Sequence, residues 1–121
     1  MLKFTVEPKR VDGDGDVETC PPRHAQFWGV YAKPWHRDVK AFGPAMHVAD
    51  YSKKTTAQTV RSTLARFERE RGQTPEDKVA DLLTAVFLFA HAHGVDTELC
   101  LRRARGHAEA EISGECWRDN T

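Results

Sequence analysis

The stretch His24-Ala-Gln-Phe-Trp-Gly-Val-Tyr-Ala32 decides the fold of this chain, because its aromatic and β-branched residues favour a β-strand. A second stretch, Ala45-Met-His-Val-Ala-Asp-Tyr51, also predicts a strand, since its side chains alternate between two faces. The twelve residues from Lys33 to Pro44 connect the two stretches and exceed the usual hairpin loop of about 2–5 residues. We expect the strands to pair antiparallel and the long loop to be of functional interest.

A turn precedes this pair of strands. Val11-Asp-Gly-Asp-Gly15 contains two Asp-Gly pairs, which tolerate a positive φ at low steric cost. It lies between Phe4-Thr-Val6 and Asp16-Val-Glu18, so a hairpin or a loose turn is predicted. Pro8 has no backbone N–H, and a strand that contains it is therefore expected at the edge of a sheet.

Downstream of the strands, one amphipathic helix is predicted to cover the sheet. Thr55-Thr-Ala-Gln58 fits the capping-box pattern, in which the first hydroxyl and the glutamine side chain each satisfy a backbone N–H. Apolar residues recur at steps of three and four, at Ala57, Val60, Leu64 and Phe67. This stripe predicts a helix that begins at Thr55 and is ended by Gly72.

Two further helices are predicted in the last part of the chain. Thr74-Pro-Glu-Asp77 is a typical helix start, with a capping threonine, a proline at the first helical position and two acids near the positive end of the helix dipole. This helix would run to about His93, with Gly94 as the left-handed residue after its end. Asp96 or Thr97 can cap the next helix, and the short loop between the two predicts a helix hairpin.

The predicted fold class is therefore α+β: a small antiparallel sheet covered by a helix, followed by a C-terminal helix hairpin. Residues 1–72 would hold the strands and the covering helix, and residues 73–121 the hairpin and a frayed tail after Gly114. A chain of 121 residues has about the length of one domain, so we expect both parts to form one compact unit.

Composition excludes several classes of protein. The chain has 18 basic and 18 acidic residues and no net charge, so long-range attraction of the whole molecule to nucleic acid or anionic lipid is not expected. Its longest apolar run, Ala85–Ala90, is far shorter than the about 20 residues of a membrane span. Met1–Pro8 shows no secretory signal, and the three cysteines contain no Cys-x-x-Cys pair, so reduced thiols in the cytoplasm are expected.

The two halves of the chain differ in charge, and the second predicted helix is unusually apolar. Residues 1–72 carry 13 basic and 9 acidic side chains, a net charge of +4, whereas residues 73–121 carry 5 and 9, a net charge of −4. These halves could attract each other within one molecule or between two. The apolar side chains of residues 79–90 have two interpretations: they pack under the sheet, or they form the interface of a homodimer.

Two sets of residues form recognisable patterns. Trp28-Gly-Val-Tyr31 leads to His47-Val-Ala-Asp-Tyr51 in a strand-loop-strand-helix unit. The C-terminal hairpin carries Thr74-Pro-Glu-Asp, Asp81-Leu-Leu, His93-Gly-Val-Asp96 and Arg102-Arg-Ala-Arg-Gly-His-Ala-Glu-Ala-Glu111. Both patterns resemble those of small phage- and prophage-encoded proteins of unknown function. The C-terminal pattern often has an acid and a histidine where this chain has Ala85 and Leu88, so no polar site is expected on that helix face.

The resemblance implies a small accessory protein of a mobile genetic element, located in the cytoplasm of a bacterial host and binding a host or phage macromolecule. We therefore hypothesise a non-enzymatic phage protein that binds a host macromolecule, with inhibition of a host defence system such as CRISPR as one such role. No nucleophile elbow surrounds a serine or cysteine, and no Gly-Lys-Ser/Thr triplet forms a phosphate loop. We predict neither catalysis nor a cofactor.

The candidate binding residues lie in the long loop and are Lys33, Trp35, His36, Arg37, Lys40 and Phe42. An indole can fill a pocket of a partner protein or stack on bases, and cations pair with acidic groups or phosphates. Lys53, Lys54 and Arg61 follow in sequence and are expected to extend this basic surface. We predict that Trp35 anchors a protein partner. A nucleic acid bound by the same residues is the alternative, and a third interpretation is that Trp35 folds back on the sheet.

Two patterns contain residue types that bind metals. Asp12-Gly-Asp-Gly-Asp-Val-Glu18 begins like a calcium loop but lacks the glycine at its sixth position and has Arg23 at its twelfth, so a solvated acidic turn is expected. His107 and Glu111 share a helix face, and Cys100 lies two turns earlier on roughly that face. Tetrahedral zinc needs a fourth ligand, so no metal is predicted. A metal-dependent enzyme around His107 remains an alternative function.

Overall fold

The sheet and the three helices follow one another as the sequence predicts. The computed structural model describes residues 1–114 and confirms the α+β fold. The strands are β1 (Leu2–Val11), β2 (Val17–Thr19), β3 (Phe27–His36), β4 (Ala41–Phe42) and β5 (Met46–Tyr51). The helices are α1 (Lys54–Arg69), α2 (Pro75–Ala92) and α3 (Thr97–Ile112), and a short 3-10 turn covers Pro22–His24. The tail that was expected to fray after Gly114 lies outside the described residues.

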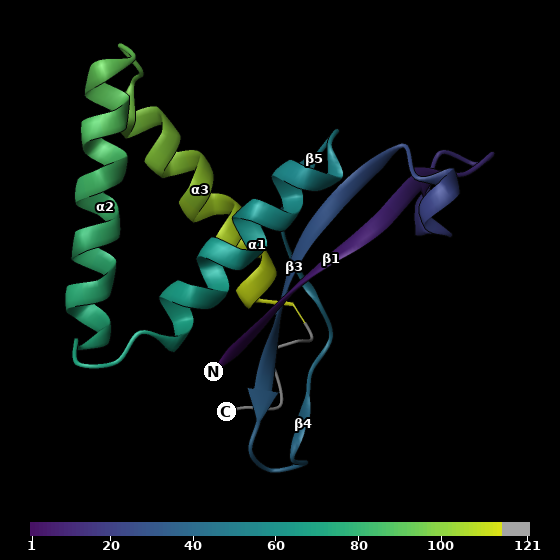
Figure 1. Ribbon diagram of the computed structural model, residues 1–121, viewed down its shortest axis with the longest axis horizontal. Coiled ribbons are helices and arrows are strands. Elements are labelled where there is room, and N and C mark those ends of the chain that lie inside the picture. Colours follow the sequence, from purple (N-terminus) through teal and green to yellow (C-terminus); the bar gives the residue numbers. More distant parts are fainter. Residues whose placement is uncertain (115–121) are drawn as a thin grey trace.

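The sheet is built on a long antiparallel ribbon of β1 and β3 (Figure 1). These strands pair from Leu2 opposite Pro34 to Lys9 opposite Phe27. β2 pairs with the end of β1, and β4 and β5 both pair with the other edge of β3. β2 pairs with β1 from Lys9 onward, and the backbone N–H of Cys20, just after β2, donates to the C=O of Pro8 at 3.1 Å. Pro8 thus lies where β2 stops covering β1, so the edge position predicted for this strand is found only between Leu2 and Pro8.

The predicted twelve-residue loop from Lys33 to Pro44 is wrong. β3 starts later than predicted, at Phe27, and continues to His36, after which a turn covers residues 37–40. β4 then pairs with the end of β3, so most of the expected loop is a β-hairpin. Its side chains are therefore held in fixed positions on two faces of a ribbon.

Pro34 does not end β3 because its polar backbone atoms face the interval between β4 and β5. The backbone N–H of Gly43 donates to the C=O of Pro34 at 2.8 Å. In a strand the backbone nitrogen and the carbonyl oxygen of one residue point to the same side. The nitrogen of Pro34 therefore faces the residues between β4 and β5, where no strand needs a hydrogen bond from it. Pro34, a residue type that usually interrupts strands, is therefore tolerated within β3.

The first residues of β1 are tied to two other elements. The backbone N–H of Trp35 donates to the C=O of Met1 at 3.1 Å. The backbone N–H of Leu2 donates to a carboxylate oxygen of Glu68 in α1, also at 3.1 Å. The start of β1 is thereby held at the hairpin end of β3.

The acidic segment between β1 and β2 is a turn whose polar atoms bond to one another. Oδ1 of Asp12 accepts from the backbone N–H groups of Asp14, at 2.8 Å, and Asp16, at 3.0 Å. In this Asx turn the Asp12 carboxylate accepts hydrogen bonds from the backbone of its own turn, in agreement with the expected acidic turn. Beside it, Nε of Arg10 lies 2.6 Å from Oε1 of Glu18, and this hydrogen bond raises the pKa of Arg10.

α1 covers one face of the sheet, as predicted, and forms the core with it. Val30 in β3 and Ala57 in α1 are completely buried. Ala32 and Met46 are also buried, and partly buried apolar side chains of β1 pack against them. The apolar stripe of α1 therefore faces the inner side of the sheet.

The predicted capping box at the start of α1 is wrong. The helix begins at Lys54, and Lys53 occupies the N-cap position without a side-chain hydrogen bond. Thr55 lies inside the first turn, where its C=O accepts from the hydroxyl of Thr59 at 3.0 Å. The helix also ends earlier than expected, at Arg69, although Gly72 does adopt a positive φ of 91°.

The signals at the ends of α2 and α3 are confirmed. The hydroxyl of Thr74 accepts from the backbone N–H of Asp77 at 3.2 Å, and Oδ1 of Asp96 accepts from that of Leu99 at 3.1 Å. Gly94 has a φ of 64°, in the left-handed region that ends α2. α2 and α3 form the predicted hairpin and diverge from their short loop (Figure 1).

Of the two interpretations of residues 79–90, packing under the sheet is wrong. α1 occupies the inner face of the sheet, and α2 stands apart from it, as Figure 1 shows. Only Ala90 is buried among the residues of α2. None of the helices within residues 1–114 has both the length and the apolar composition of a membrane span.

Candidate functional site

The predicted binding residues lie on the β3–β4 hairpin, together with one lysine from β1. Lys33 and Trp35 point to the outer face of the sheet, opposite the core residues of β3. The ring centroids of Trp35 and Phe42 are 5.0 Å apart in an edge-to-face contact, and Nζ of Lys3 lies 5.5 Å from the centroid of the Phe42 ring. Arg37 and Lys40 are exposed in the turn. We call Lys3, Lys33, Trp35, Arg37, Lys40 and Phe42 the hairpin surface.

Lys3 was missed by the sequence analysis, and His36 does not belong to this surface. Lys3 lies opposite Lys33 because of the β1–β3 register, which no local pattern reveals. His36 is only 9% exposed and points to the inner side of the hairpin. A Cβ built on Gly43 would overlap the His36 ring, so the ring fills the space that this glycine leaves open.

The lysines at the start of α1 lie far from the hairpin surface. β5 runs antiparallel to β3 and ends with Tyr51 opposite Trp28, at the other end of β3. Lys53 and Lys54 follow there, and Nζ of Lys54 lies 5.1 Å from the Trp28 ring. The expected continuous basic surface from the loop into this segment is therefore wrong.

Trp35 does not fold into the core, although its ring is partly covered. Its side chain is half-buried, and its ring packs on Phe42 of the neighbouring strand. Phe42 itself is 37% exposed. The hairpin turn projects at the lower end of the view in Figure 1. An aromatic pair flanked by cations thus lies at one end of the molecule.

A second polar cluster joins α3 to β5. One ring nitrogen each of His47 and His107 and a carboxylate oxygen of Glu111 all lie within 4.8 Å of one another. Nε2 of His47 is 2.9 Å from Oδ1 of Asp50, and Nε2 of His107 is 2.9 Å from the backbone oxygen of His47. The predicted common face of His107 and Glu111 is confirmed, and His47 is the member that the sequence analysis missed.

Cys100 does not join this cluster. His47, His107 and Glu111 line a cavity of about 440 Å³ between α3 and the sheet, whose remaining lining is mainly apolar. Cys100 instead lines a separate cavity of about 330 Å³, between α2 and α3. The spacing along α3 brings Cys100 only roughly onto the face of His107, and the structure assigns it to the neighbouring face.

The most apolar surface of the described residues lies on α2. Leu88 and Phe89 are 67% and 63% exposed. Other large apolar side chains of α2 are at least a third exposed, namely Val79, Leu82, Leu83, Val86 and Phe87. A helix with apolar side chains on most of its circumference is usually covered by other protein. This surface is therefore a candidate interface.

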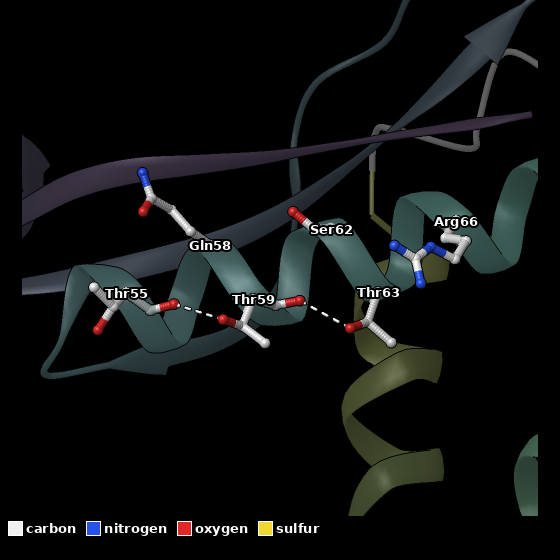
Figure 2. A pocket seen from close by; sticks show the side chains of 6 residues that line it. All are labelled: Thr55, Gln58, Thr59, Ser62, Thr63 and Arg66. Atoms are coloured by element: carbon white, nitrogen blue, oxygen red, sulfur yellow. Dashed lines mark hydrogen bonds between the residues drawn. The ribbon is translucent and has the colours of Figure 1, made fainter.

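A shallow polar groove follows the outer side of α1, and Figure 2 shows the residues that line it. They are Thr55, Gln58, Thr59, Ser62, Thr63 and Arg66. The hydroxyls of Thr59 and Thr63 donate to backbone carbonyls one turn earlier, at 3.0 and 2.9 Å. These hydroxyls are thus satisfied within the helix, and the groove has no convergent set of polar groups.

Comparison of the chain with protein-family models, with curated proteins and with solved structures finds no match.

Proposed function

We propose that this protein is a non-enzymatic accessory protein of a phage or another mobile element, which binds a host protein through the hairpin surface. The observation that carries the proposal is the grouping of Trp35 and Phe42 with four cations at the projecting end of the sheet. Central aromatic anchors with cations around them are frequent in protein interfaces. Within residues 33–42, Asp38 is the one acidic residue, so the surface suits an acidic partner.

The covered aromatic rings favour a protein partner over nucleic acid. Single-stranded nucleic acid binds by stacking successive bases on open ring faces. Here Nζ of Lys3 lies over the Phe42 ring, and Nζ of Lys9 lies 4.7 Å from the centroid of the Tyr31 ring. The rings of Trp35 and Phe42 pack edge-to-face with 70° between their planes. A lysine of the chain therefore lies over the ring of Phe42, one of the two aromatic residues of the hairpin surface.

The resemblance of residues 28–51 and 74–111 to small phage and prophage proteins supports a host macromolecule as the target. Such a protein would act in the cytoplasm of a bacterial host. We propose inhibition of a host defence system such as CRISPR as its role, because binding alone can block a host enzyme.

A site-directed cross-linking experiment tests the proposed surface. A photo-reactive amino acid replaces Val39, which is 70% exposed in the turn, and the full chain is irradiated in a bacterial lysate with and without nuclease. We expect one nuclease-resistant protein adduct. Arg37→Glu with Lys40→Glu should reduce the adduct at least tenfold, because like charges would then face the acidic partner.

The matched control reverses two cations elsewhere, Arg66→Glu with Arg69→Glu on α1, and should keep the adduct. Trp35→Ala should weaken it, provided that the circular dichroism spectrum is unchanged. Equal loss in the control, or full adduct formation by the Arg37→Glu, Lys40→Glu variant, would refute the hairpin surface. Loss of the adduct after nuclease treatment would assign the surface to nucleic acid instead.

We further propose that the partner of the apolar surface on α2 is a second copy of this chain. Residues 1–72 carry a net charge of +4 and residues 73–121 a net charge of −4. A second copy can offer its own apolar α2 to this surface. The charge opposite to that of the hairpin lies in residues 1–72 of the second copy, outside its α2.

A further inference from the structure

The cluster on α3 and β5 has the residue types and the arrangement of a metal site. His107 and Glu111 are four residues apart on α3, and His47 reaches them from β5, 60 residues earlier in the chain. Imidazole nitrogens and a carboxylate oxygen are common ligands of zinc and related ions. The converging atoms come from two elements, which distinguishes the cluster from an acidic patch on one helix.

The hydrogen bonds of the two imidazoles prepare one nitrogen of each ring for a metal. The carboxylate of Asp50 and the backbone carbonyl of His47 can only accept, so Nε2 carries the hydrogen in both rings. In the neutral rings, Nδ1 then keeps its lone pair. Histidines that bind metals almost always donate their other N–H to a carboxylate or a backbone carbonyl. Both of these partner types are present here.

The Glu111 carboxylate is the third donor. Within residues 1–114 its side chain makes no hydrogen bond or ion pair, and it is half-buried beside the apolar cavity. A carboxylate in such a place gains more from a cation than a fully solvated one does. The cluster therefore combines two imidazoles held by hydrogen bonds with a carboxylate that has no other partner among the described residues.

We propose that His47, His107 and Glu111 bind one divalent transition-metal ion per chain, with zinc as the ion that fits this donor set. Zinc–ligand bonds of 2.0–2.2 Å place the ligand atoms of a tetrahedral site about 3.4 Å apart, so the present separations must shorten by roughly an ångström. Three protein ligands leave the fourth position of a tetrahedral site to water.

The bound ion would fasten α3 to the sheet. In the structure the His107 side chain joins α3 to β5 through its hydrogen bond and an edge-to-face ring contact at 5.3 Å between the centroids of His47 and His107. Ion binding to the folded chain alone raises the free energy of unfolding. This proposal is independent of the hairpin surface, since the two sites share no residue.

Zinc titration of the full chain tests the site, with competition by a chromophoric chelator to measure affinity. We expect one zinc ion per chain and a higher melting temperature in its presence. His107→Ala and His47→Ala should weaken binding at least tenfold and abolish the thermal shift. Asp50→Ala should weaken it about 10- to 100-fold, because it removes the acceptor that orients His47.

Two further variants keep the result decisive. Glu111→Gln preserves the size of the side chain and removes its charge, so it should weaken zinc binding without disturbing the fold. His91→Ala removes an exposed histidine of α2 outside the cluster and should bind zinc as the unaltered chain does. The proposal is overturned if Glu111→Gln and His107→Ala bind zinc as tightly as His91→Ala, or if the unaltered chain binds none.

Discussion

Gly43 shows how a single residue constrains the hairpin. Its N–H donates to Pro34, and a Cβ at this position would overlap the buried ring of His36. The glycine is needed for space, because its φ lies outside the left-handed region. His36 is thus a packing residue of the hairpin.

Gly43→Ala is therefore expected to destabilise the protein by about 1–3 kcal/mol, the usual cost of an overpacked interior. Urea unfolding followed by circular dichroism measures the change as a lower midpoint with an unchanged slope. Gly13→Ala is the matched control, since a Cβ there meets no atom within 4 Å. Equal midpoints for the two variants would contradict the close contact with His36.

Thr74 caps the start of α2, whereas Thr55, near the start of α1, does not cap its helix. The hydroxyl of Thr74 accepts a backbone hydrogen bond at the start of α2, whereas no side chain caps α1. Thr74→Ala should therefore cost about 1 kcal/mol of stability. Thr55→Ala should change stability by less than about 0.5 kcal/mol. Urea unfolding compares them, and a larger loss for Thr55→Ala would restore the capping box that the sequence predicts.

The helix ends that depend on contacts within a few residues could be predicted from the sequence. The strand ends that depend on pairing with a distant strand could not. Thr74, Gly94 and Asp96 mark the ends of α2 and α3 through contacts within three or four residues. The extension of β3 past Ala32 depends on its pairing with β1 and on the hydrogen bond from Gly43 to Pro34. The local sequence, which contains a proline, predicts the end of a strand there. The local sequence predicts the end of an element only where the hydrogen-bond partners at that end are close in sequence.

The candidate sites follow the same rule. Helical periodicity alone brings His107 and Glu111 together, and that part was predicted. His47 and Lys3 join their clusters through strand register and through the packing of α3 on β5. No spacing within one element encodes those contacts, so both residues were missed.

At the scale of the whole molecule, the exposed side of α2 predicts self-association. Light scattering after size exclusion should give a mass of twice the 13.7 kDa of one chain. Leu88→Glu with Phe89→Glu should yield monomers, because charges in an apolar interface lose their hydration without gaining a partner. Val17→Glu, at a residue of β2 that is 56% exposed, is the control and should remain dimeric. A monomeric unaltered chain at micromolar concentration would contradict the second copy as partner.

The hydrogen bond from Trp35 to Met1 has a practical consequence for handling this protein. Any affinity tag or fluorescent fusion joined before Met1 would emerge beside the indole and the cations at the end of the sheet. Such a fusion would mask recognition in a capture assay, whereas a small dye coupled at that point would report occupancy of the neighbouring surface directly.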